Sequence, residues 1–166
     1  MDFLWSPWRG DYVTSSKRPE GCVFCHLAKG SDENRVSFDS EHFVLFRGTH
    51  NFVVLNLFPY TTAHLMVIPY HHSGDFASSD KATSTEMMDL AKIAQQAIAD
   101  EYRPNGFNLG MNLGSAAGAG VADHYHLHLL PRWNGDANFM TTVGETRVLP
   151  ESLEKTYTRL KPRFIR

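Results

Sequence analysis

The chain has 166 residues, of which 42% are hydrophobic and 20% are charged. This composition is typical of an ordinary globular protein and excludes disordered and fibrous classes. The 16 Lys and Arg residues nearly balance the 18 Asp and Glu residues, which gives a net charge of −2. Dedicated nucleic-acid binders usually carry a basic face, so we expect no nucleic-acid partner. One domain spanning residues 1–166 is the expectation.

The sequence also bears on compartment. No run approaches the roughly 18 apolar residues that a membrane span requires, so we expect no membrane partner. Residues 1–9 show neither the basic nor the apolar region of a signal peptide. Only two cysteines occur, Cys22 and Cys25. Without an export signal a structural disulfide is the less favoured use, and we expect a cytoplasmic protein.

The first half of the chain predicts three strands. Residues 1–20 are interrupted by proline and glycine and are expected to form an irregular extension. The apolar runs 42–46 and 52–57 are separated by a short turn and predict a hairpin of two antiparallel strands. The run 64–68 predicts a third strand, which Pro69 ends.

The clearest helix is predicted from Thr83 to about Tyr102. Apolar residues recur there at helical intervals, and Thr83 and Glu86 have the spacing of a capping box. The Pro104–Gly106 segment ends this helix.

Two more strands and a C-terminal helix complete the prediction. Residues 107–113 and 125–130 alternate in polarity, as strands with one buried face do. Residues 150–166 are expected to form a helix, from Ser152 to about Lys161, and a tail. Five strands with one long helix between the third and fourth indicate an antiparallel α+β fold, because parallel pairs would need more crossovers.

Three histidines, His124, His126 and His128, occupy alternate positions in the last predicted strand. Their side chains therefore emerge on one face of the sheet, and the residues between them face the core. A row of neutral bases beside the glycine-rich segment 114–120 indicates metal or phosphate chemistry. A sheet face that is rich in histidine by chance is the alternative.

The segment His124–Leu130 resembles the signature of the histidine triad (HIT) family, in which three alternating histidines precede two apolar residues. The resemblance implies the HIT-like fold and covers nearly the whole chain, through Cys22–Cys25, Asn56 and the segment His64–His72. Three further segments are similar to the bacterial diadenosine tetraphosphate phosphorylase branch of this family: Trp5–Arg9, Leu55–Tyr60 and Pro131–Phe139.

The resemblance implies nucleotidyl transfer on dinucleoside polyphosphates. His126 would attack the α-phosphate and form a covalent nucleotidyl-histidine, while its other ring nitrogen donates to a backbone carbonyl of the same strand. His128 would donate to the phosphate oxygens or the leaving group. In a phosphorylase, inorganic phosphate then releases ADP and ATP from diadenosine tetraphosphate. A hydrolase or phosphoramidase that uses water is the alternative, and a non-catalytic nucleotide-binding module is a further one.

The resemblance also suggests how a nucleotide is held. Asn112 and the loop from Gly118 to Gly120 would hold the phosphates, and Asn56 would contact the ribose. The base would lie between apolar side chains, for which simple core packing is the alternative: Phe24, Leu55 and Leu57.

The chain departs from the family pattern at two places. Many members carry Gly-Gln-Ser or Gly-Gln-Thr before the triad, where this chain has Ala119-Gly120-Val121. A hydroxyl that would contact phosphate or the leaving group is therefore missing. Members usually have glycine where this chain has Ala63.

The cysteine pair supplies two of the four ligands that a tetrahedral zinc ion needs. The resemblance implies the other two, which in family members with this pair are the histidine after Pro-x-x and the first triad histidine. Here these are His72 and His124, although His71 leaves the register open by one residue. The zinc would be structural, and no organic cofactor is expected. A redox dithiol and, because histidine follows Cys25, covalent haem attachment are the alternatives.

The resemblance implies a homodimer or a higher homo-oligomer. Trp5, Trp8 and Trp133 are compatible with an interface and equally with core packing. The basic residues near the C-terminus are expected to be a solvated end: Arg159, Lys161, Arg163 and Arg166.

Overall fold

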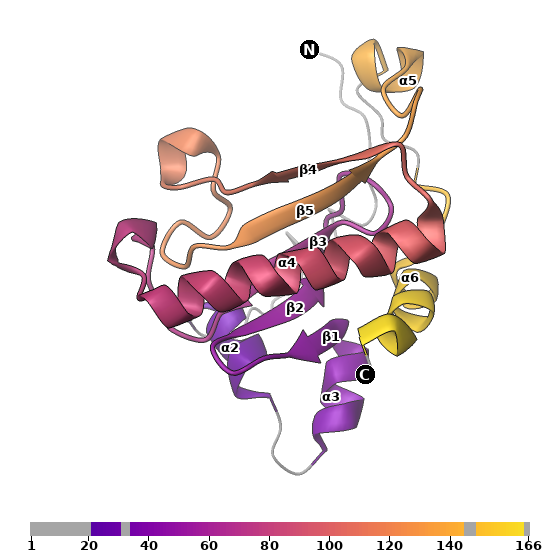
Figure 1. The fold of residues 1–166 in the computed structure, drawn as a ribbon. Helices are drawn as coiled ribbons and strands as arrows, with labels where there is room; N and C mark the ends of the chain where they lie inside the picture. Colours follow the sequence, from indigo (N-terminus) through magenta and orange to yellow (C-terminus); the bar gives the residue numbers. More distant parts are fainter. Residues whose placement is uncertain (1–20, 31–33, 145–148, 165–166) are drawn as a thin grey trace.

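The computed structural model describes residues 21–30, 34–144 and 149–164. The predicted extension 1–20, which holds Trp5 and Trp8, lies outside the described residues, and so does Arg166. The described residues form the predicted five-stranded antiparallel sheet, with strand order β1-β2-β3-β5-β4 (Figure 1).

The register of the sheet aligns one residue from each strand in a single row. Val44, Val54, Met66, His128 and Gly110 are successive partners across β1, β2, β3, β5 and β4. Paired residues share a face, so the last triad histidine continues an apolar row. The strand bounds are β1 (Val44–Arg47), β2 (Asn51–Leu55), β3 (Leu65–Pro69), β4 (Gly106–Gly110) and β5 (Leu127–Arg132).

Helices cover both faces of the sheet, with α4 and α6 on one face and α2 and α3 on the other (Figure 1). The face covered by α4 and α6 holds the larger hydrophobic core. Side chains alternate along each strand, so every second residue faces α2 and α3 instead. None of the helices that the structure describes is long and apolar enough to cross a membrane. The bounds are α2 (Val23–Lys29), α3 (Arg35–Glu41), α4 (Lys81–Tyr102), α5 (Phe139–Thr142) and α6 (Leu153–Leu160), with 3₁₀ turns η1 (Phe76–Ser78), η2 (Ser115–Ala117) and η3 (Lys161–Phe164).

The predicted long helix is confirmed, but its predicted cap is wrong. Asp80 is the N-cap, and its carboxylate accepts hydrogen bonds from the backbone N–H and the hydroxyl of Thr83. Glu86 instead accepts from three backbone N–H groups of the β1–β2 turn, at Thr49, His50 and Asn51. A local spacing rule cannot see this turn, which is more than 30 residues away in sequence.

The predicted strand over 107–113 is shorter in the structure. Among the described residues β4 ends at Gly110 and pairs with β5 alone, so it is an edge of the sheet that they form. Leu109 and Leu113 are 46% and 45% exposed instead of packing in the core. The alternation predicted around the triad is confirmed, because Tyr125, Leu127 and Leu129 all lie in the core beneath α4.

The C-terminal helix is confirmed, and Ser152 caps it. The prediction of a solvated basic end is wrong for the half-buried Arg159 and Lys161, whereas Arg163 is exposed. Arg159 bonds to Glu101 and Glu151, and Lys161 donates to the backbone carbonyls of Val44 and Leu45. Arg163 also pairs with Glu101. These cations fasten α6 and η3 to α4 and β1.

Candidate active site

A cavity of about 650 Å³, which we call the triad cavity, opens beside His126 and His128. Its floor is the apolar row of the sheet at Val54 and Met66. Helix α2 forms one wall with Phe24, whose ring centroid lies 4.8 Å from that of His126. The loop after η2 contributes Gly118, Gly120 and Val121 to the lining. The cavity therefore places two imidazoles at the border of an apolar pocket of nucleotide size.

The ring of His126 is fixed in one tautomer. Its Nδ1 lies 3.0 Å from the carbonyl oxygen of His124, to which Nδ1–H donates. The lone pair is therefore on Nε2. His126 is buried and lines the triad cavity. This contact is the one expected for a neutral nucleophile.

The ring of His128 is fixed by His64, a fully buried histidine with no role in the sequence-based prediction. The backbone N–H of Tyr60 donates to His64 Nδ1 over 3.1 Å, so a neutral His64 carries its proton on Nε2. That Nε2 lies 2.9 Å from Nδ1 of His128. His64 therefore donates to His128, and the proton of His128 stands on its Nε2. The backbone N–H of Tyr60 thus sets the tautomer of His128 through His64.

Both histidines are uncharged at neutral pH. Burial lowers the pKa of His126, and the hydrogen bond to His124 opposes this only in part. Burial, with a smaller effect from His126, lowers the pKa of His128 to about 4. The pair thus combines an acceptor nitrogen and a donor N–H at one edge of the cavity, which is the arrangement that nucleophilic attack with protonation of a leaving group requires.

The nine predicted catalytic and nucleotide-binding residues all line this one cavity, although they come from three regions of the chain. They are Phe24, Leu55, Asn56, Leu57, Asn112, Gly118, Gly120, His126 and His128.

Two of these residues differ in detail from the expectation. Leu55 belongs to the lining, but its side chain is 1% exposed and packs in the core beneath α4, so it offers a base little surface. Strand alternation gives that surface to Val54. Asn56 uses its oxygen to accept from the backbone N–H of Phe58, and its amide nitrogen lies 3.3 Å from His64 Nδ1. Asn56 therefore also orders the turn that carries Tyr60.

Other residues of the cavity were missed because they lie on helices that were not predicted or, as for His42, directly after one, where the sequence predicted the start of a strand. Helices α2 and α3 have seven residues each, which is too short for helical periodicity to appear. His42 stacks on Phe38 with ring centroids 4.1 Å apart, and its Nδ1 donates to the Phe38 carbonyl. With His26 and Glu41, His42 forms a polar margin of the cavity.

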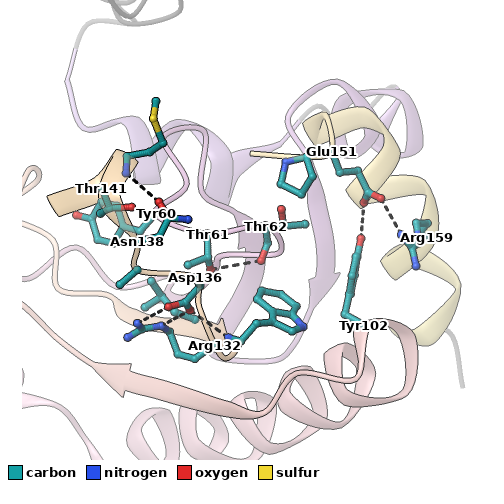
Figure 2. A pocket seen from close by; sticks show the side chains of 15 residues that line it. Tyr60, Thr61, Thr62, Tyr102, Arg132, Asp136, Asn138, Thr141, Glu151 and Arg159 are labelled. Carbon is teal, nitrogen blue, oxygen red and sulfur yellow. Dashed lines mark hydrogen bonds and ion pairs between the residues drawn. The ribbon is translucent and has the colours of Figure 1, made fainter. Parts of the chain in front are cut away.

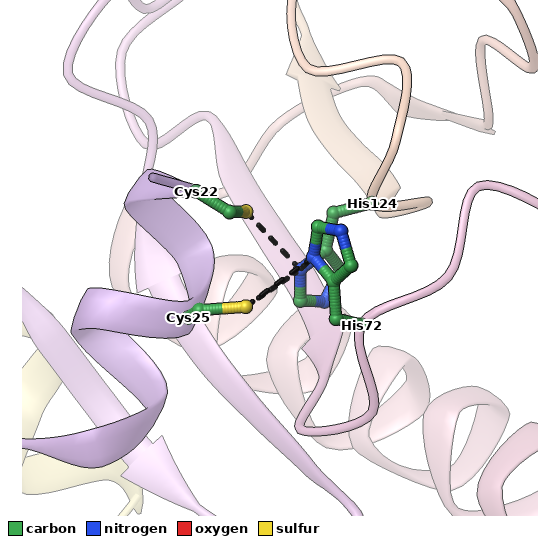
Figure 3. A group of neighbouring side chains, drawn as sticks. All are labelled: Cys22, Cys25, His72 and His124. Carbon is green, nitrogen blue, oxygen red and sulfur yellow. Dashed lines mark hydrogen bonds between the residues drawn. The ribbon is translucent and has the colours of Figure 1, made fainter. Parts of the chain in front are cut away.

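Cys22, Cys25, His72 and His124 form a cluster in which the ligand atoms all lie within 4.8 Å of one another (Figure 3). His72 takes part, and this settles the register that His71 left open. Cys25 Sγ lies 3.3 Å from His72 Nδ1 and 3.8 Å from His124 Nδ1, and the two imidazole nitrogens are 3.3 Å apart. The edges of a tetrahedron around zinc would be about 3.3–3.8 Å with ordinary Zn–S and Zn–N bonds. The donor set and its spacing fit zinc.

His124 is also held in the tautomer that a metal ligand needs. Its Nε2–H donates to the carbonyl oxygen of Pro69 over 2.9 Å, which leaves the lone pair on Nδ1. The cluster links α2, the segment after β3 and the start of the triad. The carbonyl oxygen of His124 accepts a hydrogen bond from Nδ1–H of His126, so His124 joins the cluster to the rest of the triad.

A model of the HIT domain matches residues 37–135 of the chain. This chain belongs to the HIT family. It is 37% identical over 165 residues to the AP-4-A phosphorylase of Mycobacterium tuberculosis, covering 98% of this chain and 84% of the relative. It is 31% identical over 149 residues to the Bacillus subtilis "Protein hit", covering 87% of this chain and 95% of the relative.

Solved HIT structures share the fold. A Zn-bound histidine triad family protein from Mycobacterium smegmatis superposes with a TM-score of 0.66 and 26% identity, covering 87% of this HIT chain and 93% of that protein. A HIT family member from Bacillus subtilis gives a TM-score of 0.60 and 26% identity over 87% of this chain and 97% of its own. The predicted family and fold are thereby confirmed.

Proposed function

We propose that this HIT protein is a nucleotidyl transferase that cleaves dinucleoside polyphosphates, with inorganic phosphate as the acceptor. The observation that carries the proposal is the fixed pair of tautomers: a lone pair on His126 Nε2 and a proton on His128 Nε2, both at the triad cavity. The relative in Mycobacterium tuberculosis is named as an AP-4-A phosphorylase and is similar over almost the whole chain.

The chemistry proceeds in two steps. His126 Nε2 attacks the α-phosphorus, and the bond from that phosphorus to the bridging oxygen of the leaving polyphosphate breaks as His128 supplies a proton to that oxygen. The nucleoside monophosphate is then covalently bound to His126. An inorganic phosphate oxygen attacks the same phosphorus and restores His126. With diadenosine tetraphosphate the products are ATP and ADP.

The binding roles follow the lining of the cavity. Phe24 and Leu57 would contact the base. Asn112 and the loop from Gly118 to Gly120 would hold the phosphates, where the left-handed backbone of Gly118, φ +82°, is a conformation that glycine adopts without strain. A ribose contact by Asn56 would have to share its side chain with the bonds to Phe58 and His64.

We also propose that zinc occupies the Cys22, Cys25, His72 and His124 cluster and holds α2 against the triad segment. Zinc would be a structural ion there, with all four positions filled by protein. Both thiols face imidazole nitrogens, which favours a metal ion over the redox-dithiol and haem alternatives.

A homodimer is proposed from the exposed edge of the sheet. Leu109 on β4 and Leu113 just beyond it are apolar and exposed, and an unpaired edge strand is a ready partner for a second copy. The cytoplasmic location stays a prediction of the sequence.

A product assay tests the function. Purified protein is incubated with diadenosine tetraphosphate, with and without inorganic phosphate, and the nucleotides are separated by ion exchange. We expect ADP and ATP, formed only with phosphate. AMP formed without phosphate would identify water as the acceptor, and the protein would then be a hydrolase or phosphoramidase. No cleavage in either tube would favour a binding module.

The nucleophile is tested by His126→Ala. This variant should lose turnover by at least about a thousandfold and keep nucleotide binding, because its ring carries the covalent step. His50→Ala, in an exposed turn, is the matched control and should retain full activity. Turnover by His126→Ala at the normal rate would refute the covalent mechanism.

A further inference from the structure

We propose that a second cavity beside the triad binds the second nucleoside of a dinucleoside polyphosphate. The inference rests on the proposed function and assigns a binding site to the nucleoside at the far end of its substrate. The second cavity lies between residues 60–62, the C-terminal end of α4, the end of β5 and the segments around α5 and α6 (Figure 2).

The two cavities match in size and meet at one residue. Each has a volume of about 650 Å³, and Tyr60 lines both. The ring of Tyr60 is 28° from parallel to that of His128, with centroids 6.2 Å apart. The second cavity therefore begins beside the histidine proposed to protonate the leaving group. A polyphosphate that leaves past His128 would carry its far nucleoside in this direction.

The lining favours an uncharged aromatic group over phosphate. Tyr60, Tyr102 and Trp133 contribute aromatic surface. The two arginines that line the cavity are already paired, as Figure 2 shows: Arg132 with Asp136, and Arg159 with Glu151. Their charges are neutralised within the protein, so the cavity presents no spare cation to a phosphate group. A nucleoside base, by contrast, can stack on aromatic rings.

The test compares two substrates that differ only at the far end. Diadenosine tetraphosphate carries two nucleosides, and adenosine 5′-tetraphosphate has the same phosphate chain with one. The wild-type protein should show a kcat/KM for diadenosine tetraphosphate about tenfold higher, because binding of a remote group lowers the barrier to reaction.

The cavity is then filled by Ala137→Trp, at an exposed residue of its lining. The variant should lose the tenfold preference and cleave adenosine 5′-tetraphosphate at the wild-type rate. Met88→Trp, on the exposed face of α4, is the matched control and should keep the preference. An Ala137→Trp variant that keeps the preference, or that loses activity equally on both substrates, overturns the inference.

Binding decides the inference separately from turnover. Calorimetric titration of the two nucleotides into His126→Ala, with and without Ala137→Trp, measures affinity without reaction. A tenfold affinity difference that Ala137→Trp removes supports the second site. If wild-type protein cleaves neither substrate while this difference is present, the proposed function fails and the site stands. No difference in affinity overturns the site.

Discussion

At the scale of single residues, the tautomers of two histidines decide what the site can do. The tautomer of His126 is set by the carbonyl of His124, two residues earlier in the segment that leads into β5. His128 is set through His64 by a backbone amide of the turn at Tyr60. Neither arrangement depends on a charged group, because burial keeps the imidazoles neutral.

His64→Phe tests this chain of hydrogen bonds. Phenylalanine keeps an aromatic ring at position 64 but cannot donate a hydrogen bond to His128 Nδ1, so His128 loses its fixed tautomer. We expect kcat to fall by about a hundredfold, near the lower end of what a positioned general acid contributes, with KM little changed. Steady-state kinetics with melting curves measure this, and His50→Phe is the control. Unchanged kcat would show that the His64 contact has no part in positioning.

At the scale of elements, two clusters fasten segments that are remote in sequence. Glu86 on α4 binds the turn between β1 and β2 through four hydrogen bonds, three from backbone N–H groups and one from the Asn51 side chain. Burial alone would raise the pKa of this carboxyl, but the hydrogen bonds outweigh burial and lower it. The ionised form therefore stabilises the fold at neutral pH.

Glu86→Gln should lower stability near pH 7 by about 2 kcal/mol, the range for hydrogen bonds to a charged group. Because the folded pKa lies below the ordinary value of 4.5, the Glu86 contribution is present above pH 4.5 and is lost as the pH falls through the folded pKa. The wild-type and variant melting temperatures should thus converge in acid. Asp89→Asn, which removes an exposed ion pair with Lys92, is the control and should change little. A difference in melting temperature between wild type and Glu86→Gln that stays constant down to pH 3 would contradict a stabilising role for ionised Glu86.

The cysteine–histidine cluster should fasten α2 to the triad segment. Cys25→Ser removes one of four ligands, and we expect loss of bound zinc and a melting temperature lower by about 5–10 °C. Metal analysis of the purified protein and melting curves with and without a chelator measure both. His71→Gln, next to the cluster but outside it, should keep the metal. A wild-type protein that carries no zinc, or that melts identically after chelation, would remove the zinc site.

At the scale of the whole molecule, the β4 edge of the sheet is the surface at which we propose that a second copy binds. Five strands in a row leave β1 and β4 at the two edges. β1 contacts α3 and η3, whereas β4 carries the exposed Leu109 and is followed by the exposed Leu113. A surface of this kind favours pairing with a second copy.

Leu109→Lys should convert the proposed dimer to a monomer, because a charge at a buried edge contact is costly to desolvate. Light scattering coupled to size exclusion measures the mass, and Met88→Lys on α4 is the control. A wild-type protein that is monomeric at micromolar concentration would end the proposal.

The sequence by itself determined the order of the strands along the chain, the long helix and the triad, because each carries a local period that persists over several residues. The family resemblance supplied the cysteine–histidine set and the cavity residues, and the structure brings both sets together. Short helices were not predicted, because α2 and α3 have too few turns to show a period. His42, which follows α3 at the margin of the cavity, was therefore placed in a strand.

Only the tertiary structure decided where remote polar groups meet. Glu86 has the spacing of a local cap, yet its partners are three amides of a turn more than 30 residues away. In the sequence His64 is only one residue of a predicted strand. Its hydrogen bond to His128 depends on the pairing of β3 with β5. The second cavity depends on segments 60–62, 130–141 and 150–159 closing around one space. Alternation and helical periodicity record which face of an element is buried, whereas hydrogen bonds between distant segments follow from how those faces are assembled.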